Sequence, residues 1–184
     1  MKALVLPTAL PIAMIATLLA AAPAAAQLAR NSDAPVDISA DEAEVAQSQC
    51  SSTWRGNAEA LQGDARLRAQ VIRAFFEAKP KKPGGASNDC GDLTRLEAEG
   101  GVYYVTADRR VRGDAATYEA KTETIVMTGD VVAVQGQNVL RGTRMVINVQ
   151  TGEGRMVGTA AGRNQPGRPR GVFYPSKKNQ SPSK

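Results

Sequence analysis

Apolar and polar residues alternate along much of the chain, and this two-residue period is typical of strands that bury one face. The stretches "TIVMT", "DVVAVQ" and "RMVINV" are short, rich in β-branched residues and bounded by Gly, Asp or Asn. The stretch "DARLRAQVIRAFFEAK" is also compatible with a helix, but its apolar residues fit the strand register of its neighbours. The pattern therefore predicts an all-β protein with antiparallel strands.

The alternation recurs every 29 residues, and glycines mark the recurrence. One extra segment of 15 residues, around the loop-like "KPKKPGGASNDCGD", brings the N-terminal half into the same register. We expect each repeat to form two or three short strands, with glycines where strands end and the chain turns or bulges. Successive repeats would stack on their neighbours. The glycines of the repeat are Gly56, Gly100, Gly113, Gly129, Gly142 and Gly158.

The equivalent apolar positions of the repeats share one face of the predicted sheet. We expect this face to line the interior, with small residues such as Ala43, Ala74, Ala98 and Ala116 leaving space along it. The candidate interior residues are Val45, Trp54, Leu67, Ile72, Val111, Tyr118, Ile125, Met127, Leu140, Met145, Ile147 and Met156.

The N-terminus has the pattern of a secretory signal peptide over residues 1–26. Lys2 precedes an apolar run, and small residues at Ala24 and Ala26 offer a cleavage site before Gln27. The alternative is that the apolar run remains as a membrane anchor, because its length is close to the roughly 20 residues that span a bilayer.

The remaining chain divides into a β-domain and a tail. We expect the β-domain over residues 27–162, with an insertion at about 79–92. Residues 163–184 form a basic tail, in which one further strand is expected at 171–174. Basic tails often meet polyanions, and the alternative is a solvated, disordered tail.

Cys50 and Cys90 are the only cysteines of the chain. Because an exported protein folds in an oxidising compartment, we expect a disulfide between them. The alternative is a pair of free or buried thiols. Their spacing matches neither a C-x-x-C redox motif nor a zinc ribbon.

Catalytic and metal chemistry is poorly supported by the composition. The chain has no histidine, which excludes Ser-His-Asp, Cys-His and His-rich zinc sites. Glu97 and Glu99 share a strand face, but such pairs usually belong to a solvated surface. We therefore expect no catalytic residue, no metal and no cofactor.

The formal net charge is +5, and its basic excess lies in the C-terminal tail. Arg109, Arg110 and Arg112 cluster at one strand end and offer contacts for phosphates. The favoured interpretation is that they face solvent and keep exposed edges soluble. Aromatic residues make up only 4% of the chain, so we expect no nucleic-acid partner.

Several motifs resemble the OstA-like family of periplasmic lipopolysaccharide-transport bridge proteins. They are "VDISADEAEV", "WRGNAEALQGDARLRA", "LEAEGGVYYV" and, at residues 116–142, "ATYEAKTETIVMTGDVVAVQGQNVLRG". The resemblance covers roughly residues 36–160. The insertion, the cysteine pair and the basic tail depart from the family pattern.

The resemblance implies a β-jelly roll of two facing, twisted sheets around a slightly open, tapered channel. It also implies a periplasmic protein that holds the acyl chains of lipopolysaccharide between the sheets. Protomers would join head to tail through edge strands and link inner-membrane to outer-membrane transport components. The candidate edges lie near 36–45 at one end and near 155–160 or 171–174 at the other.

Two other functions remain compatible with the sequence. One is a membrane-anchored component of the same transport machinery, if the N-terminal segment is retained. The other is a structural β-repeat protein that carries no lipid.

Overall fold

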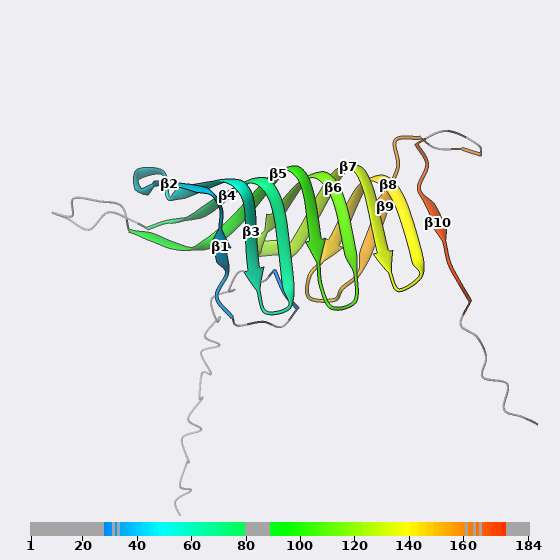
Figure 1. The fold of residues 1–184 in the computed structure, drawn as a ribbon, viewed down its shortest axis with the longest axis horizontal. Helices are drawn as coiled ribbons and strands as arrows, with labels where there is room; N and C mark the ends of the chain where they lie inside the picture. Colours follow the sequence, from blue (N-terminus) through cyan, green and yellow to red (C-terminus); the bar gives the residue numbers. More distant parts are fainter. Residues whose placement is uncertain are drawn as a thin grey trace, which may run out of the picture.

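The structure is a computed structural model that describes residues 28–30, 32, 34–79, 89–160, 162–163, 165 and 167–175. In this part of the chain, ten strands form a single antiparallel sheet that does not close on itself (Figure 1). The all-β, antiparallel prediction is confirmed. The expected signal peptide and most of the expected insertion lie outside the described residues.

The long strands follow one another across the sheet in chain order, whereas the short ones pair at its two ends. At the N-terminal end β1 and β2 both pair with β3, and at the C-terminal end β9 and β10 both pair with β8. The elements are β1 Asp37–Ser39, β2 Glu42–Ala46, the 3-10 helix η1 Gln47–Gln49, β3 Ser51–Gln62, β4 Ala65–Ala78, β5 Cys90–Val105, β6 Arg110–Glu119, the 3-10 helix η2 Ala120–Thr122, β7 Thr124–Gln135, β8 Asn138–Asn148, β9 Gly154–Val157 and β10 Arg170–Val172.

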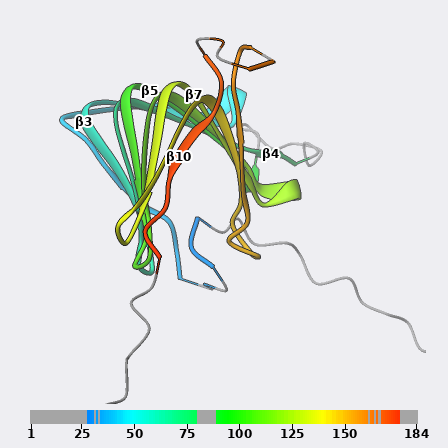
Figure 2. The same cartoon turned by 90° about the vertical axis from the view of Figure 1, so that its right-hand side faces the viewer.

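Each long strand pair has a β-bulge, and the sheet bends there so that its two halves face each other. Viewed from the end, the folded sheet has the shape of an inverted V (Figure 2). The two layers expected from the resemblance are therefore the two halves of one continuous sheet. Each repeat holds two strands, within the expected number, but the strands are longer than expected because the chain stays extended through the bend.

Most glycines of the repeat lie at this bend, in the middle of strands rather than at strand ends, and two physical reasons select them. Gly129 has a φ of +98°, a conformation that L side chains rarely adopt. Gly113 has no positive φ, but a Cβ atom there would lie 2.9 Å from the carbonyl oxygen of Thr128 on the neighbouring strand. The bend therefore needs conformational freedom at one position and close strand approach at the other.

The stretch that is compatible with a helix forms strand β4, so the strand register was the better guide. β4 ends just before the expected insertion and β5 begins inside it, and between them the Lys79 amide donates to the Asp89 carbonyl oxygen over 2.9 Å. Cys90 pairs with Ala78 at the start of β5. No helix in the described part of the chain is both long and apolar enough to cross a membrane.

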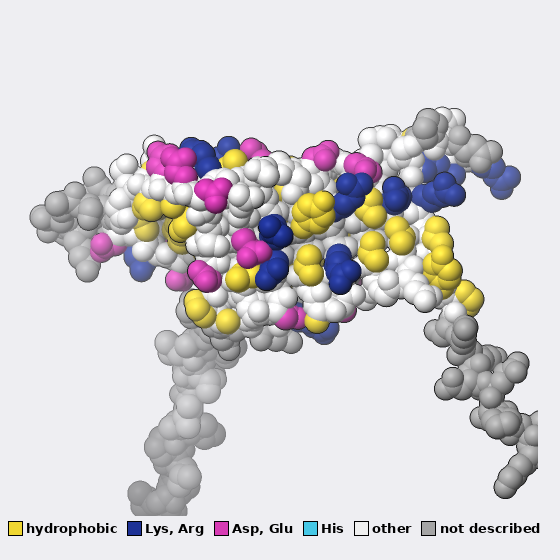
Figure 3. All heavy atoms as spheres, viewed as in Figure 1, with side chains coloured by type: hydrophobic (Ala, Val, Ile, Leu, Met, Phe, Trp, Pro, Cys, Tyr) yellow, Lys and Arg dark blue, Asp and Glu magenta, His cyan; other side chains and the backbone are white. Residues whose placement is uncertain are grey.

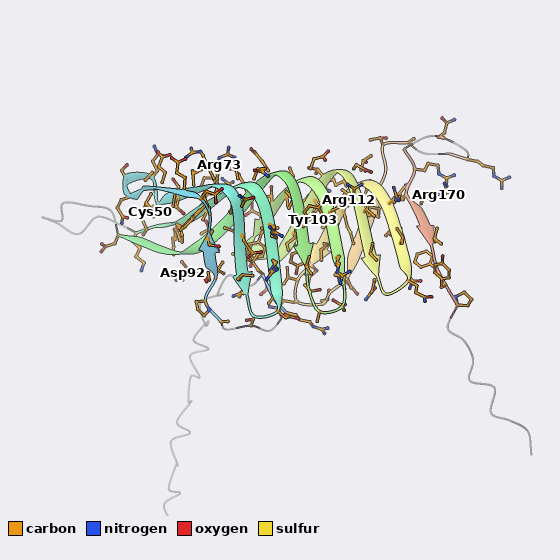
Figure 4. All side chains as sticks on the ribbon, in the orientation of Figure 1. Cys50, Arg73, Asp92, Tyr103, Arg112 and Arg170 are labelled. Carbon is orange, nitrogen blue, oxygen red and sulfur yellow. A yellow bond between two sulfur atoms is a disulfide. The ribbon has the colours of Figure 1, made fainter. Side chains whose placement is uncertain are left out.

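The predicted Cys50–Cys90 disulfide is confirmed. It joins the turn that follows η1 to the first residue of β5, at the β2 end of the sheet (Figure 4). The Phe76 amide also donates to the Cys50 carbonyl oxygen over 2.8 Å. Together these contacts tie the β2–β3 turn to the β4–β5 hairpin.

Charged residues lie side by side on the outer face of the sheet (Figure 3). Arg73 pairs with Glu99 at 3.1 Å and Arg112 with Asp130 at 2.8 Å, each across neighbouring strands. Glu97 is paired with Arg95 at 3.2 Å. Such exposed pairs stabilise the fold by about 1 kcal/mol or less each, so their main effect is to keep the outer face soluble.

Candidate functional site

Two rows of mainly apolar residues cross one layer of the sheet on its interior side. In each row the residues are direct partners across neighbouring strands, so the register brings equivalent repeat positions together. The first row is Ala43, Trp54, Ile72, Ala98, Ala116, Met127, Met145 and Met156. The second row is Val45, Ser52, Ala74, Leu96, Tyr118, Ile125, Ile147 and Gly154.

A third row crosses the facing layer, beyond the bend. Its residues again pair strand by strand, from β1 at one end to β10 at the other. The members are Ile38, Ala60, Leu67, Tyr104, Val111, Ala133, Leu140 and Gly171. The three rows line the apolar interior between the layers, which we call the groove.

Every candidate interior residue belongs to one of these rows. Trp54, Leu140 and Met156 are half-buried, and Val45 is exposed. The buried candidates are Leu67, Ile72, Val111, Tyr118, Ile125, Met127, Met145 and Ile147. The structure therefore brings the candidates together, while their contact with lipid remains a prediction.

Val45 was expected on the sheltered interior face, but it is 68% exposed. It lies on β2, the edge strand of this layer, so no further strand covers it. It lines a pocket of about 440 Å³ together with Trp54, Phe76 and the Cys50–Cys90 disulfide. Val45 thus belongs to the N-terminal mouth of the groove rather than to its interior.

A second mouth lies at the C-terminal end of the groove. A pocket of about 180 Å³ there is lined by Leu140, Met145 and Phe173, among other residues. Phe173 and Tyr174 are exposed directly after β10, and the Tyr174 amide donates to the Asn138 side-chain oxygen over 2.9 Å. The groove is therefore flanked by pockets at both ends of the sheet.

Arg109 departs from the expectation that its cluster faces solvent. Its side chain is only 15% exposed and lies 3.4 Å from the Asp108 carboxylate. Hydrogen bonding from Thr106 and from Arg109 itself lowers the pKa of Asp108. Arg109 lines a pocket of about 350 Å³ that includes Tyr104 and Thr151. It also lines the pocket at the C-terminal mouth, so it lies where the two pockets meet.

Gln62 is a polar residue on the apolar face, and sequence reasoning missed it. It follows the buried Ala58 and Ala60 at two-residue spacing and is itself only 3% exposed. Its side-chain oxygen accepts hydrogen bonds from the backbone amides of Leu28 and Ala29. The signal was available in the sequence: an amide occupies an interior position of a strand that is otherwise apolar there.

Tyr104 makes the second polar contact to this N-terminal segment, and its Oη donates to the Leu28 carbonyl oxygen over 2.9 Å. Burial raises the pKa of the Tyr104 phenol to about 12 from its ordinary value of 10.0. The fold thus favours the protonated phenol, which is also the form that donates this hydrogen bond.

Alkaline pH is therefore expected to destabilise the fold through Tyr104. The contribution is fully present below pH 10 and is lost as pH rises to about 12, on the order of 2 kcal/mol in all. Urea unfolding across this pH range should show the loss of stability in wild type. It should show the same loss in the control Tyr103→Phe, because Tyr103 is 51% exposed. Tyr104→Phe should lose the slope, and an unchanged slope there would contradict the assignment.

Among the described residues, no group of three or more His, Cys, Asp or Glu side chains is placed to hold a metal ion. The polar contacts of the interior are few, and the surrounding surface is apolar. The fold and its interior thus define an open antiparallel β-jelly roll with an apolar groove between two halves of one sheet.

Residues 37–153 match the family described as LptA/(LptD N-terminal domain) LPS transport protein. Because the match covers more than half of the chain, the protein belongs to this family of lipopolysaccharide-transport proteins. The family is one of transport proteins rather than enzymes. The resemblance identified from the sequence motifs is confirmed.

A solved structure has the same fold. It is LptH, the LptA homologous periplasmic component of the conserved lipopolysaccharide transport device from Pseudomonas aeruginosa. The TM-score is 0.64 at 19% identity, over 79% of this chain and 99% of that chain. The uncharacterized protein R00383 of Rhizobium meliloti (strain 1021) is 27% identical over 129 residues, which are 68% of this chain and 67% of that protein. The predicted β-jelly roll is therefore confirmed.

Proposed function

We propose that this protein binds lipopolysaccharide in the periplasm and forms part of a bridge that carries it from the inner to the outer membrane. The observation that carries this proposal is the continuity of the three apolar rows from one end of the sheet to the other. A row of this kind offers an acyl chain contact at every strand. Each buried methylene group would contribute about 0.8 kcal/mol.

The same rows favour sliding over tight binding. Their members are mostly aliphatic or small, so no single contact would hold a lipid tail much more strongly than the next. Buried alanines at positions 74, 98 and 116 reduce the volume of protein along the path. The buried residues of the rows belong to one hydrophobic core, so we infer that an acyl chain enters by separating the two layers at the open side of the V.

The disulfide supports a periplasmic location, because disulfides form and persist in oxidising compartments. The signal-peptide pattern of residues 1–26 provides the route of export. The solved relative LptH is itself described as a periplasmic component. We therefore place the mature protein in the periplasm.

The edge strands at the two ends of the sheet are the proposed contact sites for partners. β2 and β1 end the sheet on one side, and β9 and β10 end it on the other. Unpaired backbone groups at such edges accept a further strand, either from another copy in head-to-tail assembly or from inner- and outer-membrane transport components. Val45 and the pair Phe173 and Tyr174 add exposed apolar surface at these ends.

A photo-crosslinking amino acid tests the groove directly. Placed at Tyr118, Ile147 or Leu140, it should capture lipopolysaccharide, because these residues belong to the interior rows. The matched controls are Thr117 and Val146, which alternate with them on the opposite face. Capture is measured as the yield of lipid-linked protein in cells. Equal capture from both faces would contradict a binding path between the layers.

A further inference from the structure

The N-terminal segment occupies part of the groove. We call Leu28, Ala29, Arg30, Ser32 and Ala34 the seal segment. Leu28 is 0% exposed and Ala29 is 1% exposed, and both pack in the hydrophobic core. In the end-on view the blue segment that precedes β1 lies between the two arms of the V, at its open side (Figure 2).

Both the oxygen and the nitrogen of the Gln62 side-chain amide bind the seal segment. The side-chain oxygen accepts from the Leu28 amide and, over 3.2 Å, from the Ala29 amide. The side-chain nitrogen donates to the carbonyl oxygens of Ser32 at 3.5 Å and Ala34 at 2.8 Å. Tyr104 adds the contact to the Leu28 carbonyl oxygen. Two side chains of the wall thus bind the backbone of the segment.

This arrangement is costly unless the segment is present. An amide buried in an apolar layer is destabilising when its hydrogen bonds are lost, and the seal segment supplies four hydrogen bonds to Gln62. The Leu28 side chain meanwhile fills apolar space next to the third row, to which Tyr104 belongs. The segment therefore supplies both the apolar contacts and the hydrogen bonds of this wall. If it were absent, an apolar ligand and water would have to supply them together.

We propose that the seal segment closes the β3–β5 half of the groove, and that an acyl chain must displace it from Gln62 to enter. The inference rests on the proposed function, because it names an acyl chain as the competitor. The segment precedes β1 by only a few residues, so a displaced segment would stay tethered close to the groove. The tethered seal segment and the acyl chain would then compete for the same site on the protein.

A disulfide lock is the first test. A Cβ atom at Gly63 would lie 3.5 Å from the Ala29 Cβ atom, which is within the range of disulfides. The oxidised Ala29→Cys/Gly63→Cys variant of the mature protein should bind lipopolysaccharide at least tenfold more weakly than Gly63→Cys alone. The single variant is the matched control, because it carries the same strain at φ +57°. Equal affinity of the two would overturn the proposal.

A variant that weakens the hold on the seal segment is the second test. It is sufficient by itself if the disulfide-locked variant does not fold. Gln62→Met removes the hydrogen bonds but keeps the side-chain length, so the open fraction and the affinity for lipopolysaccharide should rise about tenfold. Gln70→Met, on the outer face, is the matched control. In wild type, hydrogen exchange at the Leu28 and Ala29 amides should speed up when lipopolysaccharide binds. Unchanged exchange and affinity would overturn the seal.

A second probe separates this inference from the proposed function. N-phenyl-1-naphthylamine is apolar and becomes fluorescent in apolar sites. If it binds the Gln62→Met variant more tightly than the locked one, while none of the variants binds lipopolysaccharide, the seal stands and the proposed function fails. If lipopolysaccharide binds equally to all variants, the proposed function stands and the seal fails.

Discussion

Replacing Cys50 and Cys90 together by alanine is expected to lower the free energy of unfolding by about 4 kcal/mol. The bond joins residues 40 positions apart, and removing it frees the unfolded chain in the loop-entropy model. Small domains are stable by only about 5–15 kcal/mol, so this is a large share of the total. Urea unfolding of the mature protein measures the loss as a lower midpoint.

The effect should also appear at the N-terminal mouth of the groove. The disulfide lines the same pocket as Val45, Trp54 and Phe76. Wild type under a reducing agent should reproduce the destabilisation of the double variant, which serves as the control for the substitutions themselves. A loss of less than about 1 kcal/mol in both cases would contradict the stabilising role assigned to the bond.

Substitution of Gly129 by alanine is expected to cost about 2–3 kcal/mol. A positive φ of +98° disfavours any side chain by about 1–2 kcal/mol. The added Cβ would also overlap the Asp114 carboxylate, whose Oδ2 accepts from the Asp130 amide over 3.3 Å. Moving Asp114 aside would lose that hydrogen bond, which is worth about 1 kcal/mol.

Two other glycines separate the causes of this loss. Gly101 has a φ of +77° but no atom within 4 Å of an added Cβ, so Gly101→Ala should cost about 1 kcal/mol from backbone strain alone. Gly113→Ala has no such strain but meets the Thr128 carbonyl oxygen, and about 1–3 kcal/mol is expected from overpacking. Denaturant unfolding should rank Gly129→Ala above Gly101→Ala. The reverse order would show that the contact with Asp114 is not restrictive.

Much of the candidate groove was predictable from local pattern. A strand has a side-chain period of two, so alternation alone assigns residues to one face. Ala116 and Met145 are 29 residues apart and lie in the same row, with Met127 between them. A step of one repeat crosses two antiparallel strands and returns to the equivalent position along the strand direction. Repeat positions therefore become cross-strand neighbours.

Other features depended on long-range contacts that no local pattern encodes. Val45 carries the right alternation but lies on an edge strand, where no neighbour covers it. The sequence predicts Arg109 to be a surface charge, but the folded hairpin buries most of its side chain. Both outcomes depend on which strands end the sheet and which turns face each other.

The sequence by itself determined the strand period, the repeat, the interior face and the family, because each depends on residues close together in the chain or on spacing alone. Only the tertiary structure decided that the strands run unbroken through the bend, that the two layers are one sheet, and that the N-terminal segment lies in the groove against Gln62. The reason is physical. The contacts of Gln62 join residues about thirty positions apart, and such a pairing is selected by burial and hydrogen bonding in the folded chain.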